Sequence, residues 1–149
     1  MPFTHISLLR GHSPEYIKAL SESLHQALVE TFDVPNNDRF QAIHQHEPYE
    51  LIFDPHYLGG LKPRSKHFVL FNIIAGKIRN HATKQRFCER LVERLATSPG
   101  LQKEDVMIII STTQSDDWSF SNGHIFDIYP KIIENNRDTT HELTKRKIP

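Results

Sequence analysis

The sequence predicts a two-layer α+β fold, in which two β-α-β units form a four-stranded mixed sheet with both helices on one face. Segments with strand, helix and strand periodicity follow one another in that order, and the order occurs twice. Matching residues in the two units are separated by similar distances in the sequence: Gly76 follows Gly11 by 65 residues, and Asp105 follows Asp38 by 67. The 149 residues suffice for one domain and are too few for two of ordinary size.

The first unit begins with residues 3–9, which alternate between apolar and polar side chains and predict a strand. Ser13 and Pro14 suit the N-cap and the first position of a helix, and an apolar stripe extends that helix to about residue 32. After a turn at 34–37, residues 39–46 predict a second strand.

The second unit repeats the pattern. Residues 67–75 are a strongly apolar strand, residues 81–97 predict a helix that Gly100 would end, and residues 105–113 predict the fourth strand. The two strands of each unit should be parallel, with a right-handed crossover. Strand 67–75 is apolar on both faces, although both helices lie on one face. We therefore expect a homotrimer in which subunits cover the open face and the edges of the sheet.

The end of the chain differs from the two units. Asn122-Gly123 predicts a tight turn and a short hairpin. From about residue 130 the chain is polar. We expect one domain over residues 1–128 and a C-terminal tail over 129–149 that is extended or weakly ordered, with a partner-contacting tail as the alternative.

Composition argues against several classes of protein. Lys plus Arg equals Asp plus Glu at 18 each, so no basic surface for nucleic acid is expected. A single cysteine, Cys88, allows no intrachain disulfide and fits a reducing compartment. The N-terminal segment lacks the features of a secretory signal, and no apolar run is long enough to span a membrane. These observations predict a cytoplasmic protein.

Three features carry a resemblance to a known family: Pro2 directly after the initiator methionine, the segment VPNNDRFQ at 34–41, and the motif DDWSFSNG at 116–123. Together with the double β-α-β pattern, they resemble the malonate semialdehyde decarboxylase-like branch of the tautomerase superfamily, from Pro2 to about His124. The resemblance implies a duplicated β-α-β fold, a homotrimer, and an active site built around the terminal proline near a subunit interface.

Pro2 is the first catalytic candidate. A small second residue favours removal of Met1, which would leave a secondary amine. A free α-amino group titrates near neutral pH and can move protons as base or acid, or attack a carbonyl. The alternative is that Pro2 is ordinary N-terminal sequence.

Asp38 is the second catalytic candidate. It matches an aspartate that in the decarboxylase-like branch orients or activates water, and a carboxylate beside Pro2 would raise the pKa of the amine. The alternative is that Asp38 satisfies the turn, a role that would also suit Asp105.

Four residues are candidates for substrate binding. Lys77 and Arg79, in AGKIRN at 75–80, match two arginines that bind the substrate carboxylate in the decarboxylase. Lys77 departs from that pattern, because lysine offers a point charge where arginine offers a two-pronged fork. Solvated charges at a strand end are the alternative. The resemblance also makes Trp118 and Phe120 an apolar wall of the site, with hairpin packing or subunit contact as alternatives.

No metal or other cofactor is expected. His44 and His46 share one strand face and His25 lies on the first helix, but the sequence has no spacing typical of a metal site. We interpret Cys88 as a packing residue.

The preferred function is a Pro2-dependent tautomerase that interconverts keto and enol forms of small carboxylate-bearing oxo acids. The close alternative is a malonate semialdehyde decarboxylase-like lyase or hydratase that acts on 3-oxo or unsaturated acids, which would also need Asp38 and tight orientation by Lys77 and Arg79. A second alternative is a non-catalytic trimeric binding protein.

Overall fold

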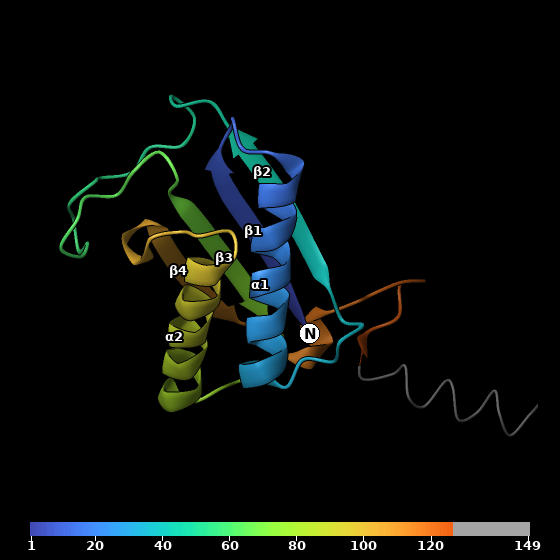
Figure 1. The fold of residues 1–149 in the computed structure, drawn as a ribbon. Helices are drawn as coiled ribbons and strands as arrows, with labels where there is room; N and C mark the ends of the chain where they lie inside the picture. The colour runs from blue at the N-terminus through green and yellow to red at the C-terminus, as the bar shows by residue number, and fades with distance from the viewer. Residues whose placement is uncertain (127–149) are drawn as a thin grey trace, which may run out of the picture. The chain divides into compact units, whose positions relative to one another are not determined.

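In a computed structural model, which describes residues 1–126, four strands form one sheet in the order β2-β1-β3-β4 (Figure 1). The strands are β1 (Pro2–Leu9), β2 (Phe40–His46), β3 (Val69–Ala75) and β4 (Val106–Thr112). Strand β1 pairs in parallel with β2 and antiparallel with β3, and β3 pairs in parallel with β4. The predicted mixed sheet of two parallel units is confirmed.

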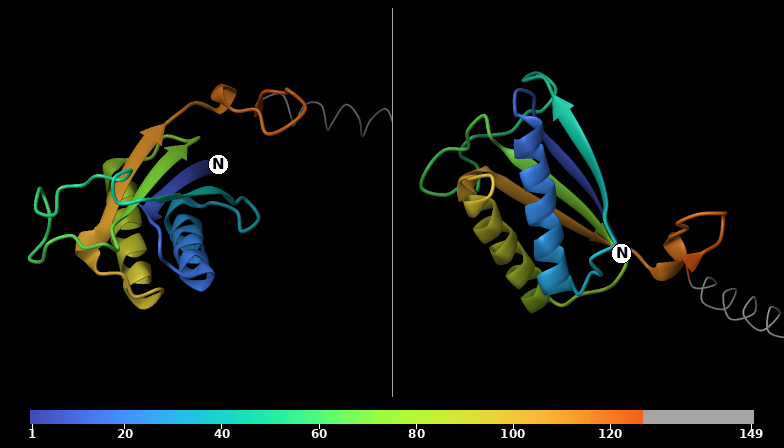
Figure 2. Two further views of the ribbon diagram at one scale, coloured as in Figure 1. Left: turned by 90° about the horizontal axis from the view of Figure 1, so that it is seen from above. Right: turned by 45° about the vertical axis from the view of Figure 1, so that its right-hand side comes forward.

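Both helices cover the same face of the sheet, as Figures 1 and 2 show from three directions. They are α1 (Pro14–Phe32) and α2 (His81–Thr97), and the second has the bounds that its periodicity predicts. Helix α1 begins as expected at Ser13, whose hydroxyl accepts a hydrogen bond from the Tyr16 amide at 3.1 Å. Asn80 caps α2 in the same way.

The core lies between the helices and the sheet. Every second residue of β1 and β3 is buried, and α2 contributes Phe87, Leu91 and Leu95, each fully buried. Burying one such side chain stabilises the fold by about 1.5–3 kcal/mol. The expected apolar face of this helix is therefore the face that holds it on the sheet.

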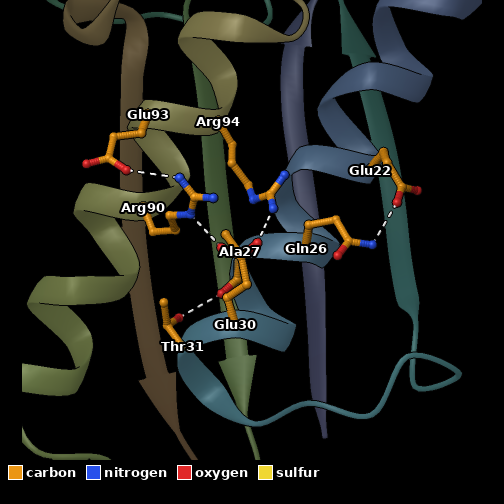
Figure 3. A network of polar contacts seen from close by, with 8 residues as sticks. All are labelled: Glu22, Gln26, Ala27, Glu30, Thr31, Arg90, Glu93 and Arg94. Carbon is orange, nitrogen blue, oxygen red and sulfur yellow. Dashed lines mark hydrogen bonds and ion pairs between the residues drawn. The ribbon is translucent and has the colours of Figure 1, made fainter.

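A charged network links the two helices on their outer side (Figure 3). Arg90 Nε lies 2.5 Å from a Glu30 oxygen, and Arg94 binds the other oxygen of the same carboxylate. The two arginines lower the pKa of Glu30 to about 2. The helices are therefore joined by ion pairs at their surface as well as by the core beneath.

The opposite face of the sheet carries apolar side chains without a helix over them. Phe40 is 45% exposed, and Met107 and Ile109 on β4 are 44% and 41% exposed. Phe40 and Met107 stand 67 residues apart in the sequence and have nearly the same exposure on the same face. The duplication expected from the sequence is thus visible in the environment of single residues.

The segment after β4 belongs to a separate unit: residues 1–112 form one compact unit, and residues 113–126 are part of another. Asn122 and Gly123 have φ of 58° and 72°, so the expected turn is present. The expected hairpin strands are absent from residues 113–126, where a short 3-10 helix, Ser115–Asp117, and turns occur instead. The tail predicted over 129–149 lies outside the described residues. Among residues 1–126, neither helix has the length and apolar character of a membrane-spanning segment.

Candidate active site at the start of the central strand

Pro2 is the first residue of β1, an inner strand, and it is buried. It pairs with Ala75, the last residue of β3. On the other side of β1, strand β2 begins at Phe40, which pairs with Phe3. One end of the sheet thus brings together the start of the chain, the turn before β2 and the segment after β3.

Asp38 and Gly76 hold the first residue from both sides. The Met1 α-ammonium lies 2.8 Å from Asp38 Oδ2, and both side chains are largely buried. The Gly76 amide donates a hydrogen bond of 2.8 Å to the Met1 carbonyl oxygen. A β-carbon at position 76 would lie 3.0 Å from Met1 Cβ and 3.2 Å from the Met1 carbonyl oxygen, so the glycine allows a close approach to this residue. Asp38 therefore pairs with the amine of Met1, the residue that precedes Pro2.

Lys77 and Arg79 follow directly and differ in how they are held. The Lys77 side chain is exposed and its ammonium has no hydrogen-bond or ion-pair partner among residues 1–126. The Arg79 guanidinium donates to the Phe32 carbonyl at 2.9 Å and to the Lys77 carbonyl at 3.1 Å, and its central carbon lies 4.2 Å from the centre of the Phe32 ring. Burial lowers the pKa of Arg79, while Asp33 at the end of α1 opposes this shift.

Arg79 is thus held by three contacts, whereas the Lys77 ammonium is exposed and has no partner among residues 1–126. The three contacts of Arg79 leave part of its fork of five N–H groups available to a ligand. The contact with Phe32, which lies 47 residues earlier in the chain, could not be expected from any local pattern. A carboxylate would meet one rigid partner and one adaptable partner at this end of the sheet.

Trp118 and Phe120 form a local aromatic cluster in the second unit. Their rings stack with centroids 5.7 Å apart, and Phe126 packs edge-on against Phe120 at 5.8 Å. The Trp118 indole donates a hydrogen bond of 2.6 Å to the Thr113 hydroxyl. The two rings therefore pack against each other within residues 113–126, although the hairpin expected to hold them is absent there.

The histidines and the cysteine of the sequence analysis have other partners. The His25 imidazole is buried and donates to the Asn36 carbonyl at 2.9 Å, while His44 lies 2.8 Å from a nitrogen of His5. Burial raises the pKa of the Cys88 thiol, which favours the protonated form. Within residues 1–126, no three His, Cys, Asp or Glu side chains are arranged to hold a metal ion.

Comparisons with known proteins find similar sequences over most of the chain. A family profile described as "Tautomerase enzyme" matches residues 38–121, and a second profile with the same description matches residues 2–60. A probable tautomerase of Bacillus subtilis (strain 168), YusQ, is 34% identical over 123 residues, which are 83% of this chain and 95% of that protein. YrdN, a probable tautomerase of the same organism, is 33% identical over 123 residues, 83% of this chain and 93% of that protein.

Solved structures give the same fold. A malonate semialdehyde decarboxylase inhibited by 3-bromopropiolate superimposes with a TM-score of 0.79 at 32% identity, over 87% of this chain and 96% of that one. A second malonate semialdehyde decarboxylase, solved in wild-type, mutant and inactivated forms, gives 0.75 at 32% identity, over 82% and 92% of the two chains. A protein described as native fused 4-OT shares the fold at 16% identity with a TM-score of 0.66, over 86% of this chain and 98% of that one.

Proposed function

Because the chain belongs to the tautomerase family, we propose that it is a cofactor-independent enzyme that interconverts keto and enol forms of small oxo acids through Pro2. The observation that carries this proposal is the start of β1, where the terminal ammonium lies 2.8 Å from Asp38 beside the segment that holds Lys77 and Arg79. An amine, a carboxylate and two cations at one strand end are the groups that proton transfer on an anionic substrate needs.

Pro2 acts after Met1 has been removed. Its nitrogen then becomes a secondary amine at the position where β1 starts, next to Asp38. The neutral amine takes a proton from the carbon beside the substrate carbonyl, and the electron pair of that bond moves toward the carbonyl oxygen. The resulting ammonium returns the proton to oxygen or to carbon, while the Asp38 carboxylate stabilises it.

Lys77 and Arg79 hold the substrate carboxylate in this proposal. Arg79 is already positioned by Phe32 and fixes the direction of the carboxylate, because little conformational freedom remains to be lost on binding. The exposed Lys77 ammonium binds the same carboxylate from the solvent side.

The second candidate is decarboxylation of a 3-oxo acid, or hydration of an unsaturated acid. It is supported by the 32% identity with two malonate semialdehyde decarboxylase structures and by the position of Asp38, which could direct a water molecule. Lys77 stands against it, because the corresponding decarboxylase residue is expected to be an arginine. We place tautomerisation first for that reason.

A homotrimer is part of the proposal. The sheet face opposite the helices carries Phe40, Met107 and Ile109 with about half of each exposed. Several fused 4-OT structures that share the fold are described as trimers. Sheet faces packed together in a trimer would remove these side chains from water.

Covalent labelling with 3-bromopropiolate tests the role of Pro2. We expect a mass increase located on the N-terminal peptide of the processed protein, and none in a Pro2→Ala variant. The rate of keto-enol interconversion should fall by about 10²- to 10⁴-fold in the same variant, because acid–base catalysis by the proline is removed. An N-terminal peptide that stays unlabelled, together with unchanged turnover of oxo acids in Pro2→Ala, would rule out the proposed mechanism and favour a binding protein.

A further inference from the structure

A small pocket of about 200 Å³ opens at the end of the sheet opposite Pro2. It lies where β1 ends and where β3 and β4 begin. We call it the His67 pocket, and its polar lining consists of Tyr16, Ser65, His67, Gln102 and Asp105.

The His67 pocket is the internal counterpart of the Pro2 site. Strands β1 and β2 pair with an offset of 37 residues, from Phe3 to Phe40, and β3 and β4 pair with the same offset, from Val69 to Val106. The Pro2 site lies at the starts of β1 and β2 and at the end of β3. The His67 pocket lies at the starts of β3 and β4 and at the end of β1. Two equivalent sets of strand ends therefore each form a site.

The aspartates of the two sites also correspond. Asp38 lies just before β2 and pairs with the terminal ammonium, whereas Asp105 lies just before β4 and accepts two hydrogen bonds of 2.6 Å from the amide and hydroxyl of Ser65. Both Asp105 oxygens are therefore occupied, and its side chain is 1% exposed. Asp105 thus holds the Ser65 segment in place beside the pocket. The polar side chains that remain for a ligand are those of Tyr16, His67 and Gln102.

A histidine pair takes the place of the amine and the lysine. His12 follows Gly11 after β1, as Lys77 follows Gly76 after β3. Its Nδ1 lies 3.0 Å from the Leu9 carbonyl oxygen, which can only accept, so His12 Nδ1 carries a proton. His12 Nε2 lies 2.9 Å from His67 Nδ1.

This arrangement determines what His67 offers to a ligand. In the neutral pair His67 Nδ1 donates to His12, which leaves a lone pair on His67 Nε2. When the pair takes up one proton, His67 Nε2 carries a hydrogen whichever ring holds the charge, because one hydrogen is shared between the rings. The charged pair is therefore a hydrogen-bond donor at His67 Nε2.

Tyr16 supplies a second donor. Its ring stacks on His12 at 4.4 Å and lies 6.5 Å from the His67 ring. The Tyr16 hydroxyl has no hydrogen-bond partner among residues 1–126. Burial and the nearby Asp105 carboxylate raise the pKa of Tyr16, so its hydroxyl keeps its proton at neutral pH.

We propose that the His67 pocket is a second binding site, which takes a small carboxylate through hydrogen bonds from His67 Nε2 and the Tyr16 hydroxyl. A carboxylate can bind because two donors remain, because the Asp105 oxygens point at the Ser65 amide and hydroxyl, and because the histidine pair takes up a proton when the anion binds. The site binds but contains no free amine, since the chain runs through it. The proposal does not depend on the reactivity of Pro2.

Ring-nitrogen NMR of histidine-labelled protein tests this site, with sodium acetate as the probe and sodium chloride at equal ionic strength as the control. In sodium chloride alone we expect His67 in the Nδ1–H form that its hydrogen bond to His12 requires, and acetate should convert it to a form with a proton on Nε2, half-saturating at roughly millimolar concentration. Tyr16→Phe should weaken acetate binding by about five- to tenfold. Tyr57→Phe, on an exposed loop, should not. His67→Asn identifies the signals.

Three results would overturn the proposal: His67 signals that do not change up to about 0.1 M acetate, the same change with chloride, or equal affinities in Tyr16→Phe and Tyr57→Phe. Lys77→Ala separates this site from the other one. It should leave the acetate response of His67 intact even if it weakens catalysis. Loss of that response in Lys77→Ala would place the acetate at the Pro2 end of the sheet and refute the second site.

Discussion

Replacing Lys77 and Arg79 separately by alanine should distinguish substrate binding from support of the fold. Arg79 donates to two backbone carbonyls and lies over the Phe32 ring, whereas Lys77 has no such contact among residues 1–126. Two partly exposed hydrogen bonds of about 0.5–1 kcal/mol each, and a cation–π contact of about 0.5–1 kcal/mol, give a total of about 1.5–3 kcal/mol. Arg79→Ala should therefore lower Tm by about 4–10 °C, and Lys77→Ala by less than about 2 °C.

Both variants should lose activity toward acid substrates. A charge-assisted contact is worth about 1.5–3 kcal/mol, so kcat/KM should fall about 10- to 150-fold. Methyl esters of the same acids should be affected far less, because they carry no carboxylate. Thermal unfolding followed by circular dichroism, with parallel kinetics on acid and ester, measures both effects. Equal losses on acid and ester in both variants would contradict the carboxylate pocket, and an unchanged Tm in Arg79→Ala would contradict the anchoring role of Phe32.

Further outcomes are expected from the same geometry. Lys77→Arg should raise any malonate semialdehyde decarboxylation and alter tautomerisation little, and the opposite pattern would mean that the lysine does not separate this chain from the decarboxylases. Intact-mass measurement should show protein without Met1, because a retained Met1 would leave the Pro2 nitrogen as an amide. Sedimentation equilibrium at micromolar concentration should give a trimer, and a stable 17.3 kDa monomer would contradict the proposed assembly. Glu30→Gln should lower stability by about 0.5–1 kcal/mol at pH 7. Since the Glu30 pKa is lowered to about 2, urea unfolding should show this difference fading as the pH falls from about 4.5 toward 2.

The fold could be predicted from the sequence because each helix and strand has a clear apolar periodicity or a clear capping residue. The 3.6-residue spacing of Phe87, Leu91 and Leu95 predicts the buried face of α2, and Ser13 with Pro14 predicts the start of α1. The pairing of the sheet followed from the repetition of a β-α-β unit, since such units are parallel and right-handed. The prediction of hairpin strands around Asn122-Gly123 was wrong. An Asn-Gly pair predicts the conformation of the two turn residues but not the structure of the residues on either side.

The candidate site was less accessible from sequence. Pro2 and Asp38 were proposed from a resemblance, and the ion pair that places Asp38 at the terminal amine agrees with that proposal without testing its chemistry. The anchoring of Arg79 by Phe32 was missed because it depends on how α1 ends beside the segment after β3. The link between His12 and His67 was missed as well. The spacing of Gly11 and Gly76 was a usable signal, since each glycine precedes a residue that can carry positive charge.

The inner position of β1 has a consequence for folding during synthesis. This strand is synthesised before both of its partners, which begin only at Phe40 and Val69. Until β2 has been made, both edges of β1 are open to pairing with other chains, and one edge stays open until β3 follows. Helix α1 can form from local contacts within this interval and cover the apolar face of β1. Nascent chains that stop before residue 69 should therefore depend most on chaperones, and chains extended through Ala75 should depend on them far less.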